Sequence, residues 1–326
     1  MPDLGDADAP AAAAVDKPAP WTALKKYNLP AFIVLLAIIT GVLEPKFWSG
    51  DNMRNLLLQI SPLLVITAGQ SFAVIGGGLD LSVSAILAAA GVGGLAVMNQ
   101  IGIIPGVIGM PMVGAAIGLV NGLIITRFRL SPFVVTLGML SICRGATLVA
   151  TAGLPVYDIP SRFLDIFGDG RILGLPVGGI IAILCIIGCG FLLHNTVFGR
   201  YVYAVGANPI AAYNSGVNVQ RITLGIYVIT GLTSGIAAIV LTSWVAAAQP
   251  LAGSGLELQS LAAVVIGGAA LTGGSGSMMG VVYGVVILGI LSNGLNMVGV
   301  SSFYQTMTIG IIIVVAVILD RLRGKA

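Results

Sequence analysis

Few side chains in this sequence could do chemistry, and the most unusual of them lie in or beside long apolar runs. Asp80 and Glu257 each begin such a run, and Arg144 lies inside another. A charged group in an apolar environment is costly and usually faces a cavity or a partner, so both carboxylates are candidates for lining a solute path. The alternative for both is helix chemistry, because the N-terminus of a helix stabilises a nearby carboxylate. Arg144 is expected to be structural, either paired with a carboxylate such as Asp80 or bound to backbone carbonyls.

Residue types for metal binding and nucleophilic catalysis are sparse. Cys143, Cys185 and Cys189 lie in apolar runs, and the single histidine, His194, follows one. Cys185 and Cys189 are four residues apart, but a zinc site needs further ligands that the sequence does not place nearby. The sequence contains no G-x-x-x-x-G-K-[ST] loop and no convincing Ser/His/Asp set. We therefore expect no catalytic residues, no metal site and no cofactor, and we interpret the cysteines as packing residues.

The elements that must position these residues are membrane-spanning helices. The chain is 57% hydrophobic and only 8% charged, and it contains 46 glycines. A soluble domain is about 25% charged, so this composition excludes a water-soluble fold. The apolar runs are long enough to cross a bilayer as helices, and the alternating pattern of a membrane β-barrel is absent. The sequence predicts an all-α polytopic membrane protein.

The runs and their breaks predict about ten transmembrane helices. Two connections, around Gly76–Asp80 and Thr272–Ser277, are so short that broken or re-entrant segments are an alternative there. The expected spans are 28–44, 55–75, 81–98, 105–126, 132–150, 176–194, 222–246, 257–273, 278–298 and 301–319.

Lysine and arginine in short loops predict the orientation, because cytoplasmic loops are enriched in them. With the N-terminus inside, the inner segments hold Lys17, Lys25, Lys26, Arg127, Arg129, Arg200, Arg221, Arg321, Arg323 and Lys325. The outer segments hold Lys46, Arg54, Arg162 and Arg171. Both termini are thus expected in the cytoplasm. Residues 1–24, rich in Ala, Pro and Asp, are expected to be a disordered cytoplasmic tail, and 25–326 to be the transmembrane domain.

Three short matches recur in the same order at a nearly constant offset. Gly78-Leu-Asp-Leu81 matches Gly255-Leu-Glu-Leu258, and Asn121-Gly-Leu123 matches Asn293-Gly-Leu295. Phe133 and Thr136 similarly match Phe303 and Thr306. On the expected topology, spans 2–5 and 7–10 would form an inverted repeat, a common plan of transporters. The alternative is chance similarity between low-complexity apolar sequences.

The cytoplasmic loop 195–221 contains a strong signal for a short helix. Asn208 is a good N-cap, Pro209 suits the first helical position, and Gly216 suits the position after the helix end. A capped helix in such a loop is either a docking element for a soluble partner or a helix lying passively at the membrane surface.

At these residues the chain resembles the permease subunits of bacterial ABC importers of the ribose, xylose and galactose type, within the superfamily of branched-chain amino acid permeases. The resemblance runs from about residue 50 to the C-terminus. It depends on GGLDLSVS at 77–84, NGL at 121–123, SPFVVTLG at 131–138, the segment 199–216, Gln249-Pro250, and AVVIGG at 263–268 continuing to GGSG at 273–276. The family usually has Gly where this chain has Ser84.

The resemblance implies a multi-pass protein of the bacterial inner (plasma) membrane that works by alternating access. It implies a cytoplasmic ATP-binding subunit, a periplasmic solute-binding protein, and a second permease as homodimer or heterodimer, all in a lipid membrane and without nucleic acid. The carried-over ATPase-coupling residues are Arg200, Gly206, Asn208, Pro209, Ala211, Ala212 and Gly216. Because sugars are uncharged, their path needs hydrogen-bonding groups, and the path candidates are Gln70, Asp80, Asn121, Glu257 and Asn293. The polar side chains can equally link helices.

The function expected from the resemblance is import of a ribose-like pentose, a hexose or a polyol, with ATP hydrolysis on a separate subunit. One alternative is an ABC permease for another solute, such as an amino acid or a nucleoside. Another is a secondary transporter driven by an ion gradient, which predicts several intramembrane carboxylates or histidines; here Asp80 and Glu257 are the candidates. A purely structural membrane scaffold has no specific support in the sequence.

Overall fold

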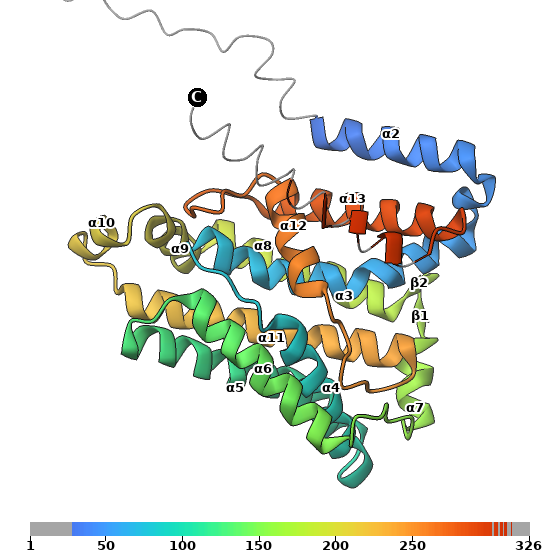
Figure 1. The fold of residues 1–326 in the computed structure, drawn as a ribbon, viewed down its shortest axis with the longest axis horizontal. Coiled ribbons are helices and arrows are strands. Elements are labelled where there is room, and N and C mark those ends of the chain that lie inside the picture. Colours follow the sequence, from blue (N-terminus) through green and yellow to red (C-terminus); the bar gives the residue numbers. More distant parts are fainter. Residues whose placement is uncertain (1–27, 302, 306, 309, 312–313, 315–326) are drawn as a thin grey trace, which may run out of the picture.

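The computed structural model describes residues 28–301, 303–305, 307–308, 310–311 and 314, and these form a bundle of helices (Figure 1). The long helices are α2 (Asn28–Leu43), α3 (Gly50–Ile75), α4 (Val83–Gln100), α5 (Ile103–Phe128), α6 (Pro132–Ala150), α8 (Val177–Asn195), α11 (Val219–Val245) and α13 (Met278–Met297). Shorter elements are η1 (Pro45–Trp48), α7 (Ser161–Phe163), η2 (Leu164–Gly168), α9 (Val197–Ala207), α10 (Pro209–Asn214) and α12 (Leu256–Ile266). Strands β1 (Arg171–Ile172) and β2 (Leu175–Pro176) form one small hairpin.

Seven of the described helices are long and apolar enough to cross a membrane: α3, α4, α5, α6, α8, α11 and α13. The prediction of an all-α polytopic protein is therefore confirmed. The expected span 257–273 is wrong, because α12 ends at Ile266 and its 11 residues reach only about 16 Å. Positive φ angles at Gly268, Gly273 and Gly274 turn the chain where a helix would continue. The expected span 301–319 and the tail 1–24 lie largely or wholly outside the described residues.

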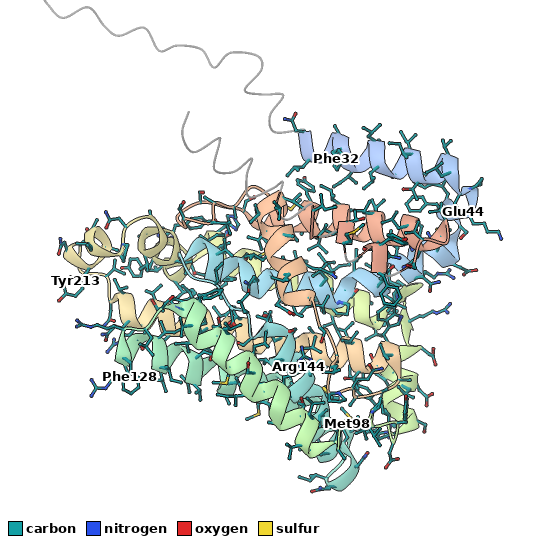
Figure 2. All side chains as sticks on the ribbon, in the orientation of Figure 1. Phe32, Glu44, Met98, Phe128, Arg144 and Tyr213 are labelled. Atoms are coloured by element: carbon teal, nitrogen blue, oxygen red, sulfur yellow. The ribbon has the colours of Figure 1, made fainter. Side chains whose placement is uncertain are left out.

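The bundle has two distinct ends. We call the end that carries α9 and α10 the α10 end, and the end that carries α7 and the β1–β2 hairpin the hairpin end (Figure 1). Tyr213 and Phe128 lie at the α10 end, and Glu44 and Met98 lie toward the opposite one (Figure 2). Since α3 ends beside α9 and α11 begins just after α10, the two central helices run in opposite directions.

Helices α3 and α11 form the centre of the bundle. Every residue of α3 from Ile60 to Ile75 is buried, and apart from Gln70 these residues are small or apolar. Helix α11 packs on α3, α4 and α5. Its contact with α5 is made through backbone, because a Cβ at Gly114 or Gly118 would overlap α11 atoms at Gly231 and Tyr227. These glycines therefore allow α5 and α11 to approach closely.

The chain twice folds back into the bundle without a helix. Residues 76–82 lead from the end of α3, near the α10 end, to the start of α4 inside the bundle. Residues 246–255 lead from the end of α11, at the hairpin end, to the start of α12. Non-helical backbone at such a depth must find partners within the protein, so these two segments are where polar side chains are needed. We call them the first and the second return segment.

Candidate functional site

Asp80, in the first return segment, is fully buried and is held by three hydrogen bonds. Its Oδ1 accepts from the backbone N–H of Ser82 at 2.9 Å and from the Ser82 hydroxyl at 2.5 Å. Its Oδ2 accepts from the hydroxyl of Thr230, on α11, at 2.6 Å. Asn121, on α5, donates from Nδ2 to Ser82 Oγ at 2.9 Å. Asp80 therefore ties the return segment to α11, and Ser82 ties it to α5.

This cluster lies deep in the bundle. Thr230 is 11 residues from the start of α11, which places it about 16 Å along a helix of about 40 Å. The carboxylate is thus near mid-bundle, whereas the sequence suggested a position close to one membrane face. Asp80 accepts from the N–H that precedes α4, so both the helix chemistry and the burial expected of it are present.

Of the five path candidates, the hydrogen bonds of the described residues join only Asp80 and Asn121, through Ser82. Gln70, on α3, is buried with neither side-chain polar atom bonded, and Asn121 Oδ1 is likewise without a partner in the described part of the chain. Glu257 is half-buried and accepts from the N–H of Gly255, which fits the helix-capping alternative. Asn293 exchanges hydrogen bonds with Asn52 at 3.1 Å and so links α13 to α3.

Arg144, on α6, binds backbone carbonyls, the second of its two expected arrangements. Its Nη1 donates to the carbonyl oxygens of Pro250 at 3.2 Å and Ala252 at 3.3 Å, and Nη2 donates to Ser84 Oγ at 3.4 Å. Those carbonyls belong to the second return segment, whose own backbone bonds are those of single turns, such as Ala252 N–H to Gln249 O. The guanidinium, with several donors in a fixed fork, can satisfy two carbonyls and a hydroxyl together.

The predicted short helix after Asn208 is confirmed as α10. Asn208 Oδ1 accepts from the N–H groups of Ile210 and Ala211, both at 3.0 Å, and Pro209 occupies the first turn. Gly216 follows the helix end with φ +84°. The helix projects from the bundle, with Tyr213 near its tip (Figure 2).

The residues expected to couple the permease to an ATPase differ in how exposed they are. Arg200, Asn208, Pro209, Ala211 and Gly216 are exposed, whereas Gly206 and Ala212 are buried against the bundle. The sequence analysis missed the two most prominent exposed apolar side chains of α10, Ile210 at 72% and Tyr213 at 71% exposed. The sequence P-I-A-A-Y-N of α10 could have indicated them, because a helix of six residues in a loop cannot bury both Ile210 and Tyr213.

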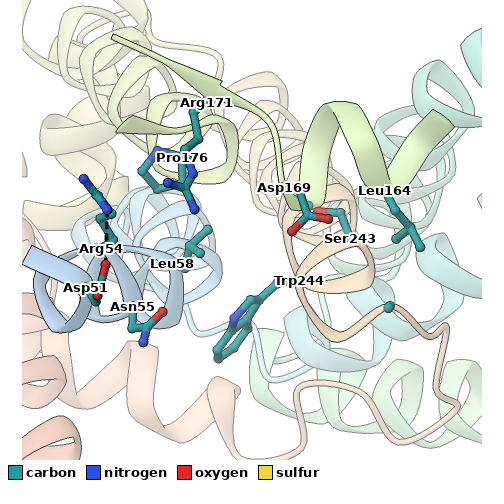
Figure 3. A pocket seen from close by; sticks show the side chains of 12 residues that line it. Asp51, Arg54, Asn55, Leu58, Leu164, Asp169, Arg171, Pro176, Ser243 and Trp244 are labelled. Carbon is teal, nitrogen blue, oxygen red and sulfur yellow. Dashed lines mark hydrogen bonds and ion pairs between the residues drawn. The ribbon is translucent and has the colours of Figure 1, made fainter. Parts of the chain in front are cut away.

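A separate pocket of about 510 Å³ opens at the hairpin end (Figure 3). Arg54 and Asp51, which form an ion pair at 3.2 Å, lie on one side of it. Asp169 and Ser243 lie on the other, and the Trp244 indole, 42% exposed, lies below (Figure 3). The sequence analysis did not single out this pocket, because it is built from three segments that are distant in sequence.

Cys185 and Cys189 are free and lie on α8 without further ligands: the described residues contain no group of three His, Cys, Asp or Glu side chains that could hold a metal ion. His194 Nδ1 donates to the carbonyl oxygen of Gly190, 3.0 Å away, within its own helix. These residues are accounted for by local packing.

Comparison with known proteins identifies the family. Residues 52–317 match the family described as "Branched-chain amino acid transport system / permease component". The chain is 43% identical over 292 residues to the ribose import permease protein RbsC of Bacillus subtilis (strain 168), covering 89% of this chain and 90% of that protein. It is 36% identical over 304 residues to the D-allose transport system permease protein AlsC of Escherichia coli (strain K12), covering 92% and 93%.

The L-arabinose ABC transporter permease protein AraH of Azospirillum brasilense is 34% identical over 304 residues, covering 93% of this chain and 89% of that protein. No solved structure matches. The match covers α3 to α13, including Asp80, Arg144 and α10, and it agrees with a helical bundle whose seven longest apolar helices can cross a membrane. The chain therefore belongs to the branched-chain amino acid transport system permease family and is a multi-pass membrane protein.

Proposed function

We propose that this chain is the permease subunit of an ATP-driven importer that carries an uncharged sugar, such as a pentose or hexose, across the bacterial inner membrane. The relatives described above are named as permeases for ribose, allose and arabinose, sugars that differ in size but share a dense set of hydroxyl groups. ATP hydrolysis takes place on a separate subunit, because the sequence has no phosphate-binding loop.

The observation that carries this proposal is α10. Its Ile210 and Tyr213 are largely exposed, and exposed apolar side chains grouped in this way mark protein interaction sites. Beside it lies a groove of about 860 Å³ lined by Tyr213, Gly216 and Arg129 among others. We assign this surface to the ATP-binding subunit, with the exposed coupling residues Arg200, Asn208, Pro209 and Ala211 around it and Gly206, Ala212 and Gly216 holding α10 in position.

The charges support a cytoplasmic α10 end. Arg127, Arg129, Arg200 and Arg221 are exposed there, whereas at the hairpin end the exposed Lys46, Arg54, Arg162 and Arg171 are offset by the exposed Asp51, Asp158, Asp165 and Asp169. Both termini are then cytoplasmic in a topology of about ten membrane segments, with a tail at 1–24, a permease domain at 25–326 and a coupling loop at 195–221. The hairpin end, with its charged pocket, is the side that receives sugar from a periplasmic solute-binding protein.

An inverted repeat supports alternating access. The order long helix, return segment, shorter helix occurs as α3, 76–82, α4 and again as α11, 246–255, α12, with the opposite direction. Asp80 and Glu257 lie at corresponding places, before and within the first turn of α4 and α12. Gln70 and Asn121, whose buried polar atoms are unsatisfied, are the path residues with hydrogen-bonding capacity to offer.

A second permease subunit fits the free face of α6. Gly138, Ser141 and Gly145 lie exposed on that face, and a Cβ at either glycine would meet nothing within 4 Å. Small residues on a membrane helix allow a second helix to approach closely.

The proposal is tested by reconstituting the permease in proteoliposomes with a candidate ATPase and solute-binding protein. Uptake of ribose, allose and arabinose is measured with and without ATP, and ATPase association is measured by copurification. In the Tyr213→Asp variant, ATPase affinity should fall by about 30-fold or more, as for loss of an interface hot spot.

The matched control is Tyr157→Asp, because Tyr157 is also 71% exposed but precedes α7 at the hairpin end. This variant should bind the ATPase like wild type. Equal binding by the two variants would contradict the docking assignment. Uptake driven by an ion gradient without any ATPase would contradict ATP-driven import and favour a secondary transporter.

A further inference from the structure

Three segments of backbone meet at the α10 end with no side chain between them. They are the turn after α3 at Gly77, the end of α9 at Gly206, and the turn after α12 at Gly273 and Gly274. We call this meeting point the glycine junction. It lies directly before α10, because only Ala207 and Asn208 separate Gly206 from Pro209.

The contacts at the glycine junction leave no room for larger residues. The N–H of Gly274 donates to the carbonyl of Ile75 at 2.8 Å, joining the turn after α12 to the end of α3. A Cβ at Gly206 would overlap the Ile75 carbonyl oxygen and lie 2.7 Å from the Gly274 nitrogen. A Cβ at Gly273 would lie 2.8 Å from both Gly206 O and Gly77 Cα. Such separations are too short for van der Waals contact, so each segment fixes the position of the other two.

Helix α9 is tied to the same turn by a side chain as well. The hydroxyl of Tyr203 donates to the carbonyl of Gly276 at 2.8 Å. The end of α9 therefore contacts the turn after α12 through both a hydrogen bond and close backbone packing. A displacement of α9 that left this turn in place would break both.

The two partners of α9 are the ends of broken membrane segments. Gly77 lies in the first return segment, three residues before Asp80, which accepts from Thr230 on α11 and from Ser82, the residue to which Asn121 on α5 donates. Gly273 lies in the turn that ends α12 and starts α13 at Met278. Helix α3 ends beside the glycine junction, and the turn that follows α12 passes through it, one segment from each half of the proposed repeat.

We propose that the glycine junction is the coupling point of this permease, at which movement of α10 by the ATPase is passed to both broken segments at once. Gly77, Gly206, Gly273 and Tyr203 are positioning residues: they contact neither sugar nor nucleotide and act through the backbone that they hold. The inference depends on the proposed function, because the movement must come from an ATPase on α10.

The test compares Gly273→Ala with Gly268→Ala in the reconstituted importer. Both glycines lie in the turn after α12 and have nearly the same backbone angle, φ +86° and +88°. A Cβ at Gly268 meets nothing within 4 Å, whereas one at Gly273 strikes Gly206 and Gly77. The two variants therefore share the strain of alanine at positive φ, and only one of them disturbs the junction.

The readout is sugar transported per ATP hydrolysed, with ATPase copurification as a check on assembly. For Gly273→Ala this ratio should fall by about fivefold or more, the lower end of typical couplings between sites. For Gly268→Ala the ratio should stay at the wild-type value even if thermal stability drops. Equal ratios in the two variants would overturn the proposal.

A second pair of variants, each of which removes only a hydroxyl group, tests the same proposal with less risk of misfolding. Tyr203→Phe removes the hydroxyl that bonds Gly276, and Tyr201→Phe removes an exposed hydroxyl from the same helix. We expect the ratio to fall by about twofold or more in the first and to be unchanged in the second. Unchanged ratios in both would count against the junction. If the wild-type permease transports no sugar when ATP is supplied, the proposed function is overturned. The coupling role of the glycine junction, which depends on that function, is then overturned as well.

Discussion

Replacing Asp80 by alanine and by asparagine distinguishes what this buried carboxylate does. Alanine removes both acceptor oxygens, which leaves the N–H and the hydroxyl of Ser82 without the acceptor that they now share. Thr230 loses less, because its hydroxyl already lies 2.9 Å from the carbonyl of Tyr227 and can donate there. Asparagine keeps one oxygen for Ser82, and its amide can donate to Thr230 Oγ1 while Thr230 donates to Tyr227.

The structure gives the expected size of each effect. Two buried donors without acceptors cost about 1–3 kcal/mol each, so Asp80→Ala should lose about 2–6 kcal/mol. Asp80→Asn preserves the number of hydrogen bonds at nearly the same side-chain volume, so its stability should lie within about 1 kcal/mol of wild type. At about 2 °C per kcal/mol, the alanine variant should unfold about 4–12 °C lower.

Thermal unfolding in detergent, followed by a thiol-reactive dye, measures both variants. Cys143 and Cys189 are free and buried, so the dye reports their exposure when the bundle opens. The expected order is wild type close to Asp80→Asn, with Asp80→Ala well below. An asparagine variant as unstable as the alanine variant would refute the hydrogen-bond account, because it would show that the negative charge itself is required.

Three further substitutions test the same packing and hydrogen bonds. Thr230→Val keeps the side-chain shape but removes the donor to Asp80. The free energy of unfolding should therefore fall by about 1.5–3 kcal/mol, which is measured as a lower unfolding temperature. Arg144→Gln should cost a similar amount for each carbonyl left unbonded, and limited proteolysis should then cut the second return segment faster than in wild type. Gly231→Ala should lower the free energy of unfolding by about 1–3 kcal/mol, because its methyl group would force α11 away from α5. In Gly138→Ala the methyl group meets no atom within 4 Å, so the unfolding temperature should be no lower than that of wild type.

The sequence predicted most helices because each needs only a local signal. An apolar run bounded by breaks is enough to place α4, α5, α6 and α8 within a few residues of their observed bounds. The α10 helix was predicted equally well, since its N-cap and stop residues lie within nine positions of each other, from Asn208 to Gly216.

The sequence failed where non-local contacts decide the structure. Residues 267–273 are apolar enough to continue α12, yet Gly268 and Gly273 turn the chain because Gly273 packs on Gly77 and Gly206. Hydropathy measures the environment of a residue and not its backbone conformation, so it could not separate a buried turn from a buried helix.

The same limit applies to the charged residues inside the bundle, and here the structure suggests why a chain with so few charges keeps Asp80 and Arg144. Asp80 lies in the first return segment and bonds Thr230, on the second long helix α11. Arg144 lies on α6, in the first half, and bonds Pro250 and Ala252 in the second return segment. Each half therefore stabilises the non-helical backbone of the other. Because both bonds cross between the halves, a relative movement of the halves must strain the Asp80 and Arg144 contacts together, which makes the two return segments respond as a pair.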